Sequence, residues 1–72
     1  MINKNLLASF MAKHGETQRD LSNALGISLS RLNAKINTWH GADFTQAEVD
    51  FVMHRYGMTK KEAGEIFYAK SI

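Results

Sequence analysis

Apolar residues recur along this chain at the spacing of amphipathic helices. The first apolar face, at positions i, i+1, i+4 and i+5, consists of Leu6, Leu7, Phe10 and Met11. Proline is absent, and five glycines with scattered serines and threonines separate the apolar faces. Because glycine is common just past a helix end, we expect the first helix to stop near Gly15. The pattern predicts helices joined by short turns.

Two short helices are predicted between Thr17 and Asn37. Thr17 can cap the first of them, with Asp20 three residues later as the acid of a capping box. Gly26 should end this helix, and Ser28 should cap the second, which covers residues 29–37. Their inward residues are Leu21, Ala24 and Leu25, then Leu32 and Ile36, with Ile27 in the turn beneath both. Two short helices joined through a glycine are typical of a helix-turn-helix.

The clearest local signals lie in the second half of the chain. Thr45 with Glu48, and Thr59 with Glu62, have the spacing of capping boxes, so each pair predicts a helix start. Phe44 flanks the first box as one half of a hydrophobic staple with Val49. The inward faces that follow consist of Val49, Val52, Met53 and Tyr56, then Ala63, Ile66 and Phe67. The fold class predicted for residues 1–72 is therefore a single all-α domain of five helices.

Composition restricts the function classes. A chain of 72 residues has room for one modest core and no large substrate cleft. Without cysteine there is no disulfide framework and no thiolate metal site, and the three histidines have no partner four residues away. No nucleophile or glycine-rich phosphate loop accompanies His40 and Asp43, so we expect no enzyme, no cofactor and no metal. The apolar runs are too short for a signal peptide or membrane span, which predicts a cytoplasmic protein with no membrane partner.

Charge is distributed unevenly along the chain. The formal net charge is +2, but residues 1–38 contain five basic and two acidic residues, whereas the remainder contains four basic and five acidic ones. The stretch from Leu21 to Ala42 contains no acid. We therefore expect any surface for a polyanion to lie in the first half.

The predicted helix at residues 29–37 has a polar face that could enter a major groove. Ser30, Asn33 and Asn37 cluster nearly opposite the inward Leu32 and Ile36. An asparagine amide can pair with adenine and a serine hydroxyl can donate or accept, so Asn33 and Ser30 are the predicted base readers.

The flank of this face carries the predicted phosphate contacts. Arg31 and Lys35 project to one side, where they could neutralise DNA phosphates. Gln18 begins the preceding helix, next to a positive helix end suited to phosphate. Double-stranded DNA is thus the predicted partner.

The segment from Gln18 to Ser28, followed by residues 30–37, resembles the Cro/CI (XRE) family of helix-turn-helix proteins. The likeness covers nearly the whole chain and is greatest to short Cro-like regulators and modulators of repression of temperate phages. It implies a five-helix Cro/CI-like domain that binds operator DNA and takes part in choosing lysogenic or lytic growth. It also implies DNA contacts at Gln18, Leu29, Ser30 and Asn33.

The sequence departs from this family at Leu29, where DNA-reading members often carry a polar residue. An exposed leucine can contact a thymine methyl but cannot hydrogen-bond a base edge. Leu29 also lies close enough to the inward stripe to be partly buried, and Ala34 is a second weak reader on the same face. These residues favour an alternative function, in which the protein binds a phage CI-type repressor and alters its DNA binding.

Several apolar residues exceed what one narrow core stripe needs. Phe51 points away from the inward face of its helix, and the C-terminal segment carries Ile66, Phe67, Tyr68 and Ile72. Completion of the core against the first helix is the favoured interpretation. The alternative is a homodimer or heteromer interface, for which Leu29, Phe51, Phe67 and Tyr68 are the candidates. Trp39, in the loop before the fourth helix, is expected to cover the core, with stacking on a nucleic-acid base as the alternative.

Overall fold

The computed structural model describes residues 2–68. Ile72, which the sequence analysis considered with the C-terminal apolar residues, lies outside the described residues. Five α-helices and a short 3-10 turn follow one another, with no strand between residues 2 and 68. Their bounds are α1 Lys4–Lys13, α2 Gln18–Leu25, α3 Leu29–Ile36, η1 Trp39–Gly41, α4 Gln46–Arg55 and α5 Lys60–Phe67. This confirms the prediction of an all-α domain with five helices.

The helices begin where side-chain caps satisfy the free N–H groups of a first turn. The predicted capping boxes at Thr17, Thr45 and Thr59 all form, each with the acid three residues later. Ser28 caps α3 through the N–H of Arg31, as predicted. The cap of α1 was not predicted: the Oδ1 of Asn3 accepts the N–H of Leu6 at 3.1 Å.

The five helices surround one apolar core. Buried side chains come from every α-helix and from the connection between α4 and α5: Leu7, Phe10, Met11, Leu21, Leu32, Ile36, Val49, Val52, Tyr56, Met58, Ala63, Ile66 and Phe67. Leu25, Ile27 and Met53 pack against them while partly exposed. The N-terminal segment is tied to the last helix because the N–H of Asn3 donates to the carbonyl of Ile66 at 2.7 Å.

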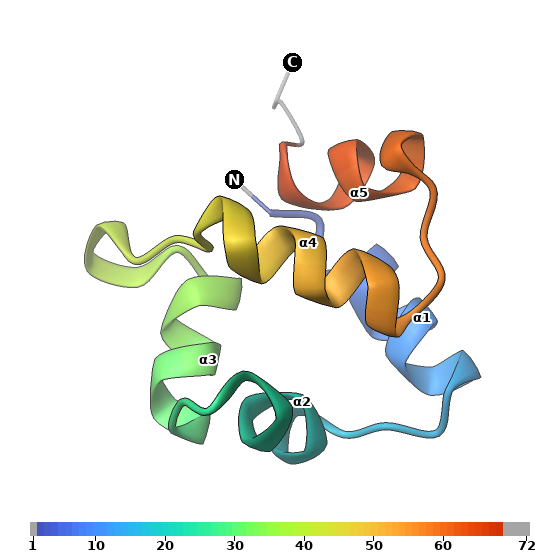
Figure 1. Cartoon of the computed structure of the whole chain (residues 1–72). Helices are drawn as coiled ribbons and strands as arrows, with labels where there is room; N and C mark the ends of the chain where they lie inside the picture. Colours follow the sequence, from blue (N-terminus) through green and yellow to red (C-terminus); the bar gives the residue numbers. More distant parts are fainter. Residues whose placement is uncertain (1, 69–72) are drawn as a thin grey trace.

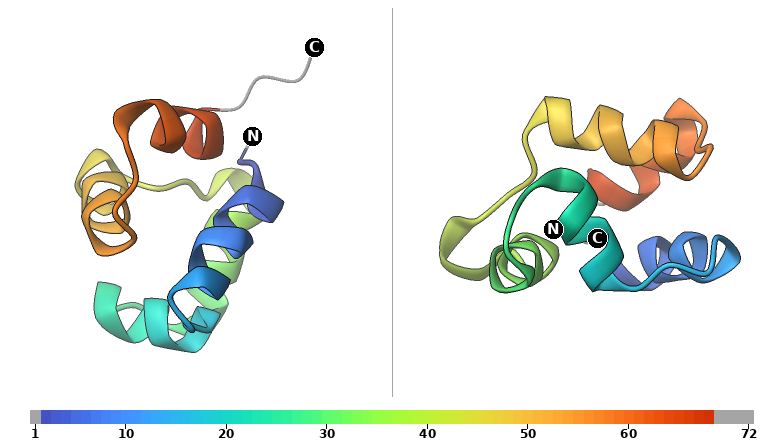
Figure 2. Two further views of the ribbon diagram at one scale, coloured as in Figure 1. Left: turned by 90° about the vertical axis from the view of Figure 1, so that its right-hand side faces the viewer. Right: turned by 60° about the horizontal axis from the view of Figure 1, so that its bottom comes forward.

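The helices form an arrangement that leaves α2 and α3 at one end of the domain. Figure 1 shows α2 at the bottom and α5 at the top, with α4 between them, and the side view in Figure 2 agrees. The loop that contains η1 projects from the end of α3 away from α5 (Figure 1).

Of two predictions about aromatic residues, core completion by Phe67 is confirmed and core coverage by Trp39 is wrong. Phe67, a candidate interface residue, is 7% exposed, and its ring meets the edge of the Phe44 ring at 5.1 Å, so it completes the core. Trp39, expected to cover the core, is 64% exposed because the backbone at Thr38 and His40 turns the loop outward. Phe51 and Tyr68 are exposed, as an interface would require.

No helix within residues 2–68 could cross a bilayer. The longest, α1 and α4, have ten residues each. Ten helical residues span about 15 Å, half of the roughly 30 Å hydrocarbon core of a membrane.

Candidate nucleic-acid interface

The α2–α3 pair is held by a three-residue turn whose geometry follows from its sequence. Gly26 has φ +73°, a left-handed conformation that glycine adopts without a Cβ clash. The N–H of Ile27 then bonds back to the carbonyl of Ser22 at 3.0 Å. Leu21 and Leu32, both fully buried, join the two helices to the core. Apolar contacts on one side of α3 therefore join it to the core, and the opposite side is left to solvent.

The solvent side of α3 contains the predicted base readers. Ser30, Asn33 and Asn37 are exposed, as the helical spacing predicts. Leu29 and Ala34 are half-buried at the borders of this face. Of the two positions considered for Leu29, the structure thus favours the edge of the apolar stripe.

Lys4 is a neighbour of this face that the sequence analysis missed. Its Nζ donates to the Oδ1 of Asn37 at 3.3 Å, across 33 positions of the chain. Lys4, Asn5 and Gln18 line a shallow hollow of about 290 Å³ together with Asn33 and Asn37. No local signal marks Lys4, because its proximity to α3 depends on how α1 packs.

Lys35 does not lie on the exposed flank that was predicted for it. The residue is 5% exposed, and its Nζ donates to the Oε1 of Glu48 and to the carbonyl of Asp43, both at 2.9 Å. The first turn of α4 lies over this side of α3 and supplies the carboxylate. Lys35 therefore joins α3 to α4 and cannot reach a phosphate without breaking this ion pair.

The ionisation of Glu48 agrees with this structural role. Burial alone would raise its pKa, but hydrogen bonds from the Lys35 ammonium and the Thr45 N–H outweigh burial and lower the pKa below its ordinary value. The carboxylate thus stays charged and serves two functions, as the acid of a capping box and as the partner of Lys35.

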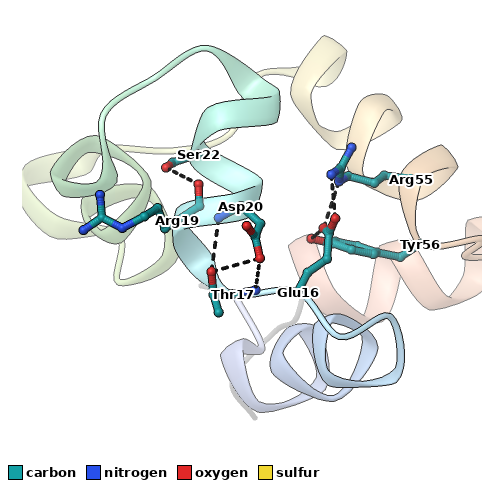
Figure 3. A network of polar contacts seen from close by, with 7 residues as sticks. All are labelled: Glu16, Thr17, Arg19, Asp20, Ser22, Arg55 and Tyr56. Atoms are coloured by element: carbon teal, nitrogen blue, oxygen red, sulfur yellow. Dashed lines mark hydrogen bonds and ion pairs between the residues drawn. The ribbon is translucent and has the colours of Figure 1, made fainter.

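Arg31 keeps the flanking position predicted for it. It is exposed, and it makes no ion pair with a carboxylate anywhere in residues 2–68. Arg19 on α2 is also exposed, and its guanidinium extends away from the polar network at the start of that helix (Figure 3). Two free guanidinium groups and the Lys4 ammonium are therefore available near the α2–α3 pair.

A second polar network fixes the start of α2 against the end of α4 (Figure 3). The Glu16 carboxylate accepts hydrogen bonds from the Nε of Arg55 at 2.9 Å and from the hydroxyl of Tyr56 at 2.7 Å. These bonds, from Arg55 first and Tyr56 second, lower the pKa of Glu16. Burial, assisted by Glu16, raises the pKa of Tyr56. His14 adds a bond from its Nε2 to the Tyr56 carbonyl at 3.1 Å.

The arrangement has the chemistry to bind a polyanion. Its exposed amides and hydroxyl can hydrogen-bond base edges, and its cations can contact phosphates. Comparison with protein-family models, with curated proteins and with solved structures finds no match to this chain. The functional argument therefore rests on this surface.

Proposed function

We propose that the protein is a transcriptional regulator that binds operator DNA through α2 and α3, used as a helix-turn-helix of the Cro/CI type. The observation that carries the proposal is the exposed polar face of Ser30, Asn33 and Asn37 with Arg31 beside it. By the family resemblance of residues 18–37, the regulated decision is the one between lysogenic and lytic growth of a temperate phage.

In this proposal α3 enters the major groove and each side chain has a chemical role. Asn33 pairs with the N6 and N7 of an adenine, and Ser30 bonds a neighbouring base edge. Leu29 contributes apolar contact at the border of the face. Arg31 and Lys4 contact phosphates on the two sides of α3, and Gln18 does so from the N-terminus of α2.

The proposal predicts a moderate dependence of binding on salt. Only a few cations are available, and the logarithm of the binding constant falls with the logarithm of salt by about 0.9 per phosphate contacted. Two or three cationic contacts correspond to a slope of about −2 to −3. The value should be well below that of a strongly basic DNA-binding domain.

The test begins with selection of duplexes from a random library by the purified protein, followed by titration of a recovered duplex at two salt concentrations. Arg31→Met should weaken binding to all duplexes and reduce the salt slope by about 1. Asn33→Ala should relax preference at one base pair by about 1–3 kcal/mol. Lys61→Met, which removes an exposed cation from α5, is the matched control and should change neither quantity. Failure of the wild-type protein to bind any duplex at low salt would refute the proposal.

A second candidate function is binding of a phage CI-type repressor, with a change in that repressor's DNA binding. The specific observation is that Phe51 and Tyr68 expose 40% and 58% of their surface. Large exposed aromatics are common at protein interfaces. Size-exclusion chromatography with the repressor encoded beside this protein should then give one complex; two unchanged species would exclude the idea. The protein alone, run over a concentration series, would report a homodimer.

A further inference from the structure

Trp39 is the most exposed large apolar side chain in the described part of the chain, with 64% of its surface accessible. It belongs to η1, directly after the C-terminus of α3, in a loop that projects from the domain (Figure 1). A partner that covers this indole would remove a large apolar area from water, so the side chain is available for contact. The position of the loop indicates what that partner is.

The local backbone holds the indole outward. Thr38 and His40 have φ of +51° and +52°, in the left-handed region that non-glycine residues rarely adopt. The N–H of Ala42 bonds to the carbonyl of Trp39 at 2.9 Å and closes the turn. The His40 ring packs against the indole with 4.1 Å between centroids. Trp39 is thus held in a defined position before any partner arrives.

The indole lies beside the polar face of α3. Trp39 lines a shallow open hollow with Ser30, Asn33, Ala34 and Asn37, and these four residues all belong to α3 or its cap. A molecule seated on the predicted base readers would therefore contact the indole as well.

The charge around this hollow favours a polyanion. The hollow that Trp39 lines contains no acid, and the next hollow along α3 is lined by Arg31, Lys35 and His40 with Asp43 as its one carboxylate. A negatively charged partner in the Trp39 hollow would meet no carboxylate there, and the indole N–H could donate to its oxygens.

We propose that Trp39 is a DNA contact that extends the surface of α3 beyond Asn37. Its ring packs on the apolar faces of deoxyriboses and base edges at the rim of the groove that α3 occupies. This inference rests on the proposed function, since it requires α3 to face duplex DNA. It adds an apolar contact to a surface whose other predicted members are mainly polar or charged.

The chain contains a single tryptophan, so its fluorescence reports on this contact directly. The probe is a duplex recovered by selection with the wild-type protein, labelled for anisotropy. On titration, Trp39 emission should change, and its quenching by acrylamide should fall, in parallel with the anisotropy. Trp39→Ala should weaken binding about tenfold, whereas Trp39→Phe, which keeps an aromatic ring, should stay within about threefold.

A double variant provides the matched control. Trp39→Phe combined with Lys61→Trp moves the only indole to an exposed position on α5, outside the hollow, where emission should not respond to the duplex. Because Trp39 contributes little to the core, circular dichroism of Trp39→Ala should match the wild type. The affinity change therefore reports contact and not unfolding.

The outcomes separate this inference from the proposed function. If the duplex binds without a change in Trp39 emission and Trp39→Ala binds equally well, the inference is overturned while DNA binding stands. If no duplex binds at low salt, both fail. If Trp39 emission responds to a repressor protein and not to DNA, the inference is overturned in favour of a protein contact.

Discussion

Replacing Lys35 with methionine would distinguish a structural lysine from a DNA-binding one. Methionine keeps the apolar stem of the side chain and removes the ammonium, so the packing between α3 and α4 is largely retained. The variant loses two hydrogen bonds, to the Glu48 carboxylate and the Asp43 carbonyl. It also leaves Glu48 without its cation.

The size of the effect follows from burial. Removing one partner of a fully buried ion pair costs about 3–5 kcal/mol. Here the Glu48 side chain is 18% exposed, against 6% for Lys35, and it keeps a 2.8 Å bond from the Thr45 N–H, so part of its charge remains solvated and bonded. We therefore expect a loss of about 2–3 kcal/mol, slightly below the range for full burial. A domain of this size loses roughly 4–8 °C of melting temperature per kcal/mol, which gives a shift of about 8–24 °C.

The assay is urea unfolding followed by circular dichroism, together with DNA titration at two salt concentrations under conditions where the variant stays folded. Lys35→Met should lose stability with an unchanged salt slope, whereas Arg31→Met should keep its stability and lose about 1 from the slope. The double variant Lys35→Met with Glu48→Gln should recover part of the loss, because no unpaired carboxylate remains. Wild-type stability in Lys35→Met combined with a reduced slope would refute the assignment of Lys35 to the interior.

Three further predictions concern stability. Gly26→Ala should lower the free energy of unfolding by about 1–2 kcal/mol because the φ of Gly26 is +73°. Gly64→Ala, inside α5 and free of any clash, should raise it by about 0.5–1 kcal/mol. Urea unfolding of both variants tests this, and two changes of the same sign would contradict it. Leu32→Ala should cost about 2–5 kcal/mol in the same assay, and a loss below 1 kcal/mol would contradict its full burial. Hydrogen bonds from Arg55 and Tyr56 lower the pKa of Glu16, so the stability that this carboxylate contributes is present above the ordinary pKa of 4.5 and disappears as the pH falls through the folded-state pKa. Glu16→Gln should therefore lose less stability on acidification than the wild type does. Identical plots of stability against pH would count against the network.

The helix starts could be predicted because their chemistry is local. In a capping box the donor and acceptor groups are three residues apart, so the pairs at Thr45 and Thr59 carry their own evidence. The same holds for Gly26, where a left-handed residue ends α2. The exposure of Asn33 followed from periodicity because α3 buries one stripe only.

The loop after α3 could not be predicted in this way. An apolar residue between two amphipathic helices is usually drawn into the core, and the sequence around Trp39 contains no signal to the contrary. The left-handed conformations of Thr38 and His40 decide the direction of the indole. Threonine, which is β-branched, rarely adopts this conformation, and histidine does so only in a minority of cases, so neither residue predicts it.

Lys4 and Lys35 illustrate why the charges of the site were harder to place than its polar face. On a helical wheel Lys35 lies beside the inward stripe, and its exposure depends on whether another helix covers that side. The first turn of α4 does cover it and supplies Glu48, thirteen residues further on. Lys4, in the first turn of α1, is brought to Asn37 by the way α1 packs in the domain. Tertiary packing thus removes Lys35 from the surface that could meet a polyanion, because Glu48 pairs with it. It also places the ammonium of Lys4 beside Asn37, at the opposite border of the polar face. One cation is therefore available on the α1 side of α3 where the local pattern had predicted one on the α4 side.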